Sequence, residues 1–283
     1  MSGRLILCGT PIGNLEDISS RALKVLADAD VIACEDTRRT LKLLSHFGIR
    51  ARELVSYHEG NERRAARDLH TRIAEGASVV LVSDAGMPGL SDPGYRLVQA
   101  CAGAGLPIEV VPGPSAAISA LAISGLPPAR FVFEGFLPRK QGDRRKRLEA
   151  IRTEERTLVF YESPHRIDAA LEDMSEVLGD RPAALARELT KMHEEVRRGL
   201  LPDLLDEVRA DPPRGEIVLV VGGAIHEHKV EADPDDLARR AQALMDAGVE
   251  RRDALGEVAR EAGVPKRKVF DALITARDRS GGS

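Results

Sequence analysis

The chain has 283 residues, 43% of them hydrophobic and 30% charged, with a formal net charge of −4 at pH 7. This length predicts two or three domains, and the negative balance excludes a uniformly polycationic protein. No apolar run approaches the roughly 18 residues of a membrane span, and the first apolar run is too short for a signal peptide. The three cysteines are dispersed along the chain, which predicts reduced thiols in a cytoplasmic protein.

Strands and helices are predicted to alternate along the first part of the chain. The predicted strands occupy residues 5–8, 31–34, 54–57, 79–82 and 108–111. The predicted helices occupy residues 19–29, 37–47, 61–75 and 93–103. This alternation is typical of a parallel sheet with helices on both faces.

A helix over residues 114–124 leads into a second, less regular α/β unit. The strands of this unit are predicted at residues 131–136, 157–161, 183–186 and 216–221. Its helices are predicted at residues 144–152, 165–178 and 201–210. The sequence does not reveal the directions of these strands.

The last part of the chain has a different pattern. The polar residues 226–234 predict a linker, and helical apolar spacing follows at 235–247, 251–262 and 265–277. The second and third of these helices fit a helix-turn-helix, which either touches nucleic acid or is a small structural appendage. Residues 280–283 predict a disordered tail. We therefore expect domains at residues 1–113, 114–225 and 234–279.

Three loops rich in glycine and proline follow three of the predicted strands. They are Gly9-Thr10-Pro11-Ile12-Gly13-Asn14, Ser83-Asp84-Ala85-Gly86-Met87-Pro88-Gly89 and Pro112-Gly113-Pro114-Ser115-Ala116. In an open parallel sheet, ligands bind at the carboxyl ends of the strands. Glycine lets the backbone approach a ligand closely, and proline fixes the shape of a loop. The loops therefore predict a small-molecule site built largely from backbone.

These loops belong to a set of seven segments that resembles a known family. The segments are residues 10–18, 35–40, 83–95, 112–117, 134–139, 160–166 and 186–191. In this order they resemble the tetrapyrrole-methylase fold family of S-adenosylmethionine (AdoMet)-dependent methyltransferases, and within it the enzymes that methylate ribosomal RNA. The resemblance implies two α/β lobes, with a mainly parallel N-terminal sheet and a mixed C-terminal sheet, followed by a helical unit.

The resemblance also implies an activity. A methyl group would pass from AdoMet, bound between the lobes, to the ribose 2′-hydroxyl of a cytidine in the decoding region of 16S rRNA. The partner would be this RNA or the small ribosomal subunit, and the protein would be a homodimer. Two departures from the family pattern are Met87, where threonine is common, and Val221-Gly222-Gly223, where the middle residue is often glutamate.

Eleven residues are predicted to bind the cofactor. Loop backbone can form the wall of the site, a carboxylate can accept from the amino group or a hydroxyl, and free amides at a helix start can bind a carboxylate or adenine. These arguments select Pro11, Ile12, Gly13, Asp84, Gly86, Ser115 and Ala116. The resemblance adds Met87, Tyr161, Ala186 and Glu216.

The acceptor hydroxyl is a poor nucleophile at neutral pH, so removal of its proton would help the reaction. Glu188, Lys191 and Asp36 are the candidate catalytic residues, and a structural or RNA-contacting role is the alternative for each. In-line placement of oxygen, methyl carbon and sulfur is the dominant requirement.

Basic side chains predict the contacts with RNA. Residues 139–147 hold six basic residues and one acid, and such a run can bind phosphates even on a mildly acidic protein. With no Trp and 3% aromatic residues, extensive base stacking is not expected. The candidates are Arg38, Arg39, Arg139, Lys140, Arg144, Arg145, Lys146, Arg147, Lys266, Arg267 and Lys268.

Other functions are weighed against this one. The pair His226 and His228 lies in the predicted linker without further ligands nearby, so no metal site is predicted. The first loop lacks the P-loop and dinucleotide-binding patterns, which disfavours ATP and NAD. A small-molecule tetrapyrrole methylase of the same fold is one alternative. A non-enzymatic nucleic-acid-binding protein is another, but it leaves the three loops unexplained.

Overall fold

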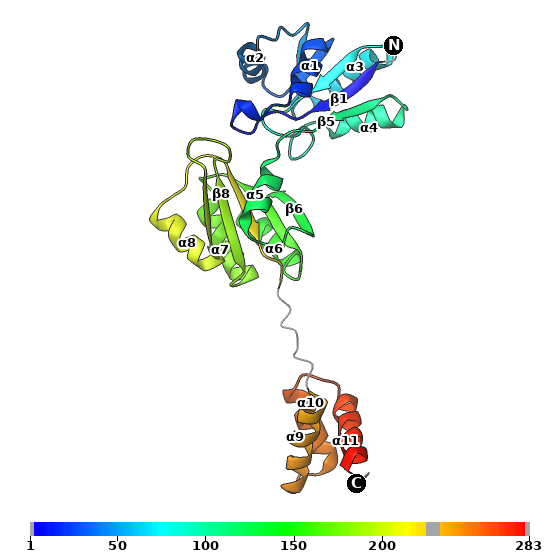
Figure 1. Cartoon of the computed structure of the whole chain (residues 1–283), viewed down its shortest axis with the longest axis vertical. Helices are drawn as coiled ribbons and strands as arrows, with labels where there is room; N and C mark the ends of the chain where they lie inside the picture. The colour runs from blue at the N-terminus through cyan, green and yellow to red at the C-terminus, as the bar shows by residue number, and fades with distance from the viewer. Residues whose placement is uncertain (1–2, 225–232, 281–283) are drawn as a thin grey trace. The chain divides into compact units, whose positions relative to one another are not determined.

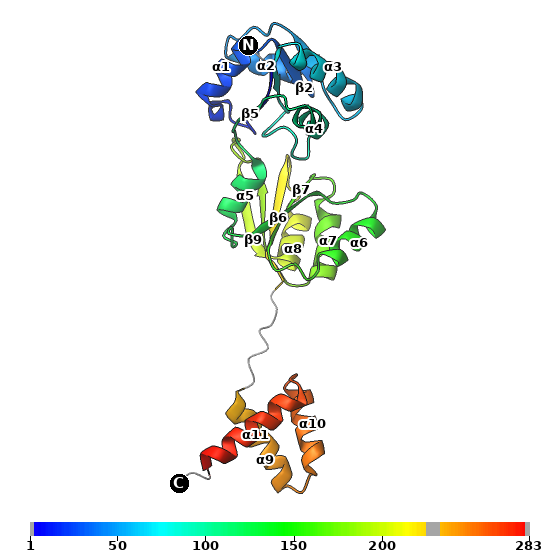
Figure 2. The ribbon, with the colours of Figure 1, turned by 90° about the vertical axis from the view of Figure 1, so that its right-hand side faces the viewer.

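The computed structural model describes residues 3–224 and 233–280 (Figures 1 and 2). Contacts divide the chain into two compact units, Met1–Ala224 and Ile225–Ser283. Of the predicted linker and tail, only residues 233, 234 and 280 fall within the described part, and Pro234 and Ser280 belong to helices. The rest, including His226 and His228, lies outside the described residues. The predicted domain boundaries stay predictions.

The first sheet of the larger unit is parallel, as predicted. Its strand order is β3-β2-β4-β1-β5, and each neighbouring pair runs in the same direction. The inner strands β1, β2 and β4 form from short apolar runs whose side chains are mostly buried on both faces, most completely in β2, whereas β5 at the edge is mostly exposed. The strands are β1 (Arg4–Cys8), β2 (Val31–Cys34), β3 (Leu54–Ser56), β4 (Ser78–Leu81) and β5 (Ile108–Val111).

Helices cover both faces of this sheet. One face packs against α1 (Ser20–Asp28) and α2 (Thr37–His46), and the other against α3 (Glu62–Ala74) and α4 (Tyr95–Gly103). The side chain of Ser19 accepts a hydrogen bond from the amide of Ala22, which caps α1.

The second sheet is mixed. Its order is β6-β7-β10-β8-β9, with β6 and β7 parallel and the other three pairings antiparallel. Four strands fall where they were predicted, but β9 was missed. Its residues include Glu195 and Arg197, which pair with each other and with Arg187 and Asp211 instead of packing apolar groups. The strands are β6 (Phe131–Phe136), β7 (Thr157–Glu162), β8 (Pro182–Arg187), β9 (Glu195–Leu200) and β10 (Ile217–Val221).

Two apolar clusters hold the helices of this lobe on its sheet. One joins α6 (Gln141–Ala150), α7 (Ile167–Leu178) and α8 (Leu201–Ala210) to one face. The other joins α5 (Ala116–Ser124) to the opposite face. Figure 2 shows α5 on the other side of the strands from α6 and α7. Because α5 directly follows β5, it connects the two lobes.

The second unit is a bundle of helices with its own apolar core. It consists of α9 (Pro234–Asp246), α10 (Arg251–Glu261) and α11 (Lys266–Ser280). Leu237, Val258 and Val269 contribute one side chain from each helix to this core. The predicted helix-turn-helix corresponds to α10, α11 and the short turn between them.

All three cysteines are buried in the first lobe as free thiols. Burial raises the pKa of Cys8 to about 12, so this thiol stays protonated at neutral pH. In the part of the chain that the structure describes, no helix combines the length and apolar character needed to cross a membrane.

Candidate functional site

The three glycine- and proline-rich loops meet at one edge of the first sheet. Because β1 lies between β4 and β5, the loops that follow these strands leave the sheet side by side. The amide of Gly9 donates to the carbonyl of Val111 over 3.0 Å. Thr10 and Gly86 exchange two backbone hydrogen bonds of 2.9 and 3.1 Å. Backbone contacts therefore fix the loops relative to one another.

Close packing around the loops requires glycine at two positions. A Cβ atom on Gly9 would lie 2.7 Å from both the Cα atom of Gly113 and the Sδ atom of Met87. A Cβ atom on Gly13 would lie 2.6 Å from the Cγ atom of Lys191 in the second lobe. These distances leave no room for a side chain. The first and third loops therefore touch through their backbones, and the first loop also touches the second lobe.

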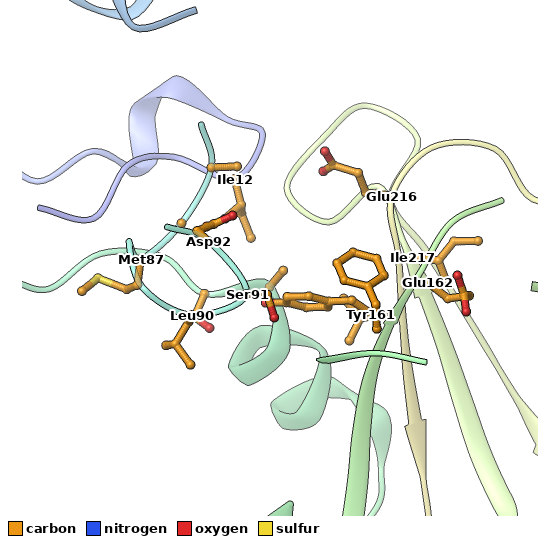
Figure 3. Close-up of a pocket in the computed structure, with 15 residues that line it drawn as sticks. Ile12, Met87, Leu90, Ser91, Asp92, Tyr161, Glu162, Glu216 and Ile217 are labelled. Atoms are coloured by element: carbon orange, nitrogen blue, oxygen red, sulfur yellow. The ribbon is translucent and has the colours of Figure 1, made fainter. Parts of the chain in front are cut away.

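A cavity of about 200 Å³, here the first cavity, lies beside these loops. In Figure 3, Ile12 and the labelled residues from Met87 to Asp92 lie on one side, and Tyr161, Glu162, Glu216 and Ile217 lie on the other. Most of the lining side chains are apolar. The lining residues are Ile12, Ala85, Gly86, Met87, Leu90, Ser91, Asp92, Ser115, Ala116, Phe136, Tyr161, Glu162, Glu216, Ile217 and Val218.

The first cavity combines an aromatic wall with the start of a helix. The Tyr161 ring packs against Phe133 and Phe136, with ring centroids 5.0 and 5.6 Å apart. Ser115 is the N-cap residue of α5, and its side chain makes no capping hydrogen bond. The first amides of α5 are thus not capped by this side chain, and such amides bind anionic or acceptor groups of a ligand. The site can therefore hold a flat apolar group and a polar one.

Asp92 is a residue of the first cavity that the sequence analysis missed. Burial, and then the nearby charge of Glu35, raise the pKa of this carboxyl to about 6. Ser91 beside it has φ 60°, a left-handed conformation that serine rarely adopts. Such strain is found where the surrounding structure imposes a backbone position. In the sequence, Ser91-Asp92-Pro93 is typical of a turn, and nothing there shows that the carboxyl is desolvated.

The predicted cofactor residues divide between two cavities. Seven of the eleven line the first cavity: Ile12, Gly86, Met87, Ser115, Ala116, Tyr161 and Glu216. Pro11, Gly13 and Asp84 instead line a second cavity. Ala186 lines neither of these two, because it is buried in β8, in the same apolar cluster as Val218.

The second cavity measures about 430 Å³ and adjoins the first. The two share Ile12, Ala85 and Glu216. The second cavity is the more polar, because it adds one side of α2 and Lys191. Its lining residues are Thr10, Pro11, Ile12, Gly13, Leu15, Arg39, Thr40, Lys42, Leu43, His46, Ser83, Asp84, Ala85, Lys191 and Glu216.

Two of the predicted catalytic residues form an ion pair beside the second cavity. The Nζ atom of Lys191 donates to Glu188 Oε1 over 2.9 Å and to Glu216 Oε2 over 3.0 Å. The hydrogen bond from Lys191 is the main reason that the pKa of Glu188 is lowered. Burial lowers the pKa of Lys191, but its bonds to the two glutamates outweigh this and raise it. Neither residue is thereby prepared to accept a proton near neutral pH.

The third candidate, Asp36, caps a helix. Its Oδ1 atom accepts from the amide of Arg38 over 2.8 Å, and the Arg38 guanidinium pairs with both of its oxygens. These bonds lower the pKa of Asp36 to about 2. Its amide also donates to Asp84 Oδ1 over 3.0 Å. Asp36 lines neither cavity among the described residues, and its position suits a structural role.

The predicted RNA-contacting arginines at the start of α2 are exposed. The side chain of Arg38 is 86% exposed and that of Arg39 is 68% exposed. Arg39 pairs with Asp84 over 3.2 Å and lines the second cavity, whereas Arg38 pairs with Asp36 outside it.

The basic run at α6 has an inner and an outer side. Arg144 is buried, and its Nε atom donates to Asp173 Oδ2 over 2.6 Å. Arg145 donates to the other oxygen of Asp173 over 2.6 Å, and Arg147 pairs with the buried Glu134. We do not propose an RNA contact for Arg144, because its guanidinium is buried and pairs with Asp173. Arg139, Lys140 and Lys146 are exposed and make no ion pair within the described residues.

The basic residues of the helical unit lie at the start of α11. The Arg267 side chain is 91% exposed, and Lys266 donates to the carbonyl of Arg252. Lys268 is partly buried. The Arg251 guanidinium lies 5.2 Å from the ring centroid of Phe270, which is 38% exposed. This surface offers cations beside an aromatic ring.

No group of three or more His, Cys, Asp or Glu side chains among the described residues could hold a metal ion. Of the two departures from the family pattern, Met87 lines the first cavity. Gly222 lies at the end of β10, and its amide donates to the carbonyl of Pro182 over 2.7 Å. A side chain there would meet the Pro182 ring at 2.9 Å, and the position lines neither cavity. The missing glutamate therefore changes nothing in these cavities.

The larger unit has a parallel α/β lobe and a mixed α/β lobe, with a cavity at the strand ends between them. This arrangement is that of a two-lobed ligand-binding enzyme. Residues 4–205 match the family described as Tetrapyrrole (Corrin/Porphyrin) Methylases. The chain belongs to this family.

Curated relatives match nearly the whole chain. A protein of Halalkalibacterium halodurans is 44% identical over 276 residues, which cover 95% of this chain and 94% of that protein. A protein of Escherichia coli O157:H7 is 48% identical, and the match covers 95% of this chain and 93% of that protein. One of Thermotoga maritima is 47% identical over 221 residues, which are 78% of this chain but 99% of that protein. All three are named Ribosomal RNA small subunit methyltransferase I.

Solved structures share the fold. A uroporphyrin-III-C-methyltransferase from Thermus thermophilus has a TM-score of 0.53 and 26% identity, covering 78% of this chain and 94% of that one. The methyltransferase CobJ has a TM-score of 0.60 and 24% identity, covering 79% and 95%. The identity of CobJ is low enough that its likeness shows the fold alone.

Proposed function

We propose that this protein transfers a methyl group from AdoMet to small-subunit ribosomal RNA, at the ribose 2′-hydroxyl of a cytidine in the decoding region of 16S rRNA. The observation that carries the proposal is the first cavity, which brings seven predicted cofactor residues together in a member of a methylase family. The relatives at 44–48% identity support ribosomal RNA as the acceptor.

The chemistry of AdoMet fits the first cavity. The flat adenine suits the apolar wall around Tyr161, and the amino-acid carboxylate suits the free amides at Ser115 and Ala116. The sulfonium carries a positive charge, which the carboxylate of Asp92 stabilises when ionised. Because the lining comes from both lobes, the donor would be fixed between them, with its methyl group in one direction.

A small-molecule tetrapyrrole acceptor is the second candidate. The name of the family and the uroporphyrin-III-C-methyltransferase likeness favour it. Two features favour RNA instead. The named RNA-methyltransferase relatives are much closer in sequence than the tetrapyrrole enzyme, and the chain carries exposed basic residues at Arg139, Lys140 and Lys146. A non-enzymatic nucleic-acid-binding function would not account for the first cavity.

The acceptor hydroxyl must lose a proton, and we assign this step to Asp92, which lines the first cavity and lies beside Ile12 in Figure 3. A base works best when its pKa lies near the pH of the reaction. The raised pKa of Asp92, about 6, meets this condition better than the lowered pKa of Asp36 or Glu188. Glu188 and Lys191 instead hold Glu216 where the two cavities meet.

The protein would act in the cytoplasm as a homodimer, on 16S rRNA or the small ribosomal subunit. Support for a second copy comes from β5, an edge strand that exposes Ile108 by 37% and Val110 by 55%. Exposed apolar edge strands are commonly covered by a partner. We also propose residues 1–113, 114–225 and 234–279 as the domains of the chain.

The test is methylation of unmodified small ribosomal subunits with tritiated AdoMet. We expect label in 16S rRNA at a single cytidine, where it blocks alkaline cleavage because a methylated 2′-oxygen cannot attack the phosphate. Fully modified subunits are the control and should take up no label. Label in a base, or labelling of a porphyrin precursor but not of RNA, would contradict the proposal.

A further inference from the structure

The second cavity lies beside the cavity that we assign to the donor, and three of the predicted cofactor residues, Pro11, Gly13 and Asp84, line it. It adjoins the first through Ile12, Ala85 and Glu216, so a molecule in one cavity lies next to a molecule in the other. The chemistry of its walls is also different. The first cavity is mostly apolar, whereas one side of α2 supplies basic and hydrogen-bonding side chains to the second.

Four of the five α2 residues that line the second cavity follow helical spacing, and the fifth is the buried Thr40. Lys42, Leu43 and His46 lie three, four and seven positions after Arg39, which places all four on one face of the helix. Leu43 is partly buried, whereas Arg39, Lys42 and His46 are exposed. This face therefore has one apolar side chain, Leu43, with cationic and polar side chains around it.

The charges of this cavity are only partly balanced. Arg39 pairs with Asp84 over 3.2 Å, and Lys191 pairs with Glu216 over 3.0 Å. Lys42 makes no ion pair within the described residues and leaves the lining with one excess positive charge. An unpaired exposed lysine at the mouth of a cavity attracts an anionic group, and a nucleic-acid strand carries one at each phosphate.

We propose that the second cavity holds the acceptor nucleotide of the RNA, with a flanking phosphate at Lys42 and His46 and its ribose at the boundary shared with the first cavity. This assignment rests on the proposed function and extends it to the residues that receive the strand. The apolar side chains of Leu15 and Leu43 suit the base. The ribose would then lie beside Ile12 and Glu216, next to the donor, as in-line transfer requires.

The experiment compares Lys42→Glu with Lys24→Glu in the full-length protein. Lys24 is an exposed lysine of α1 that lines neither cavity, so the control makes the same charge change elsewhere. Affinity for unmodified 16S rRNA, affinity for AdoMet and methyl transfer to small subunits are measured for each. We expect Lys42→Glu to weaken RNA binding about tenfold and to leave AdoMet affinity unchanged. Lys42→Ala should lower the slope of log affinity against log salt by about one.

Each other result would overturn the assignment. Equal RNA affinity of the Lys42→Glu and Lys24→Glu proteins would show that no phosphate contacts Lys42. Loss of AdoMet affinity in Lys42→Glu would show that the donor occupies the second cavity. If the wild-type protein methylates no RNA, the proposed function fails as well. If it methylates RNA and Lys42→Glu does so equally well, only the acceptor site fails.

Discussion

Asp36 and Asp92 show how the surroundings of a carboxyl determine its chemistry. Two hydrogen-bonding groups of Arg38 lower the pKa of Asp36 to about 2. Burial raises that of Asp92 to about 6. In the sequence both lie within segments of the resemblance, but only Asp36 closely follows a predicted strand, whereas Asp92 lies in a turn-like stretch, so sequence reasoning chose Asp36. The three loops could be predicted from their glycines and strand ends. Seven of the fifteen residues that line the first cavity were predicted, four from the loops and three from the resemblance. The desolvation of Asp92 could not be predicted.

The Asp92→Asn substitution should raise the stability of the protein at high pH and lower its activity. An acid with a raised pKa in the folded state stabilises the fold below pH 4, and this contribution is lost as the pH rises through about 6. Removing the charge should therefore raise the free energy of unfolding by about 1 kcal/mol at pH 8 and not at pH 4. Because asparagine cannot accept the proton, the substitution should also lower kcat about 100-fold and remove the rise of kcat with pH near 6.

Urea unfolding at both pH values and single-turnover methylation over pH 5–8 measure these effects. Asp206→Asn is the control, because it removes an exposed carboxyl that lines neither cavity. Wild-type activity of the Asp92→Asn protein would refute the proton-accepting role.

At the scale of an element, α6 shows that a charge run has two sides. Its sequence predicts an RNA-binding patch, but Asp173 of α7 accepts from Arg144, Arg145 and Gln141 of this helix. Asp173 lies 28 to 32 positions further along the chain than the residues it pairs with, so the run itself gives no sign of it. Burial alone would raise the pKa of Asp173, but these hydrogen bonds outweigh it and lower the pKa.

The Asp173→Ala substitution should destabilise the second lobe. It leaves the Arg144 guanidinium buried without its partner, which costs about 3–5 kcal/mol. Arg145→Ala should cost much less, because its side chain is 41% exposed and can be hydrated. Urea denaturation at pH 7 measures both. Equal costs for the two variants would contradict the buried-pair argument.

The same contacts decide which residues should be used to test the basic patch. Reversing the charge of Arg145 breaks its pairs with Asp173 and Glu176, so a loss of RNA binding would be mixed with a loss of stability. Lys140 and Lys146 are exposed and make no ion pair in residues 3–224. They are the positions at which binding can be measured without this effect.

Strand β9 is the element that the sequence pattern concealed. Apolar runs located the other nine strands. In β9, pairs such as Arg187 with Glu195 stabilise the edge of the sheet. Charged pairs across strands have no apolar signature, so this strand was not predicted.

At the scale of the whole molecule, both cavities are built by the larger unit alone. Every residue that lines them lies between positions 10 and 218. The relative from Thermotoga maritima matches over 221 residues and is almost completely covered, so it has no counterpart of a further helical unit of this size. The change from alternating strands and helices to helices alone predicted a separate C-terminal helical unit, and this unit has its own apolar core. The three domain boundaries stay predictions.

A protein shortened to residues 1–224 should keep AdoMet affinity, since no lining residue is lost. Its RNA affinity should fall if Lys266, Arg267 and Lys268 contact phosphates, and log affinity should then depend less on log salt. Calorimetric titration with AdoMet and filter binding of 16S rRNA at several salt concentrations measure the two effects. Loss of AdoMet binding by a shortened protein that still unfolds cooperatively would contradict the prediction.

The burial of Cys8, Cys34 and Cys101 has a practical consequence. Maleimide dyes react with thiolates at an exposed surface, and these three thiols are shielded from solvent. A single cysteine introduced on an outer helix face would therefore be the one group to take up a fluorophore or spin probe, with no native residue to remove beforehand. Pairs of such probes on the two lobes would report whether the lobes draw together as substrate arrives.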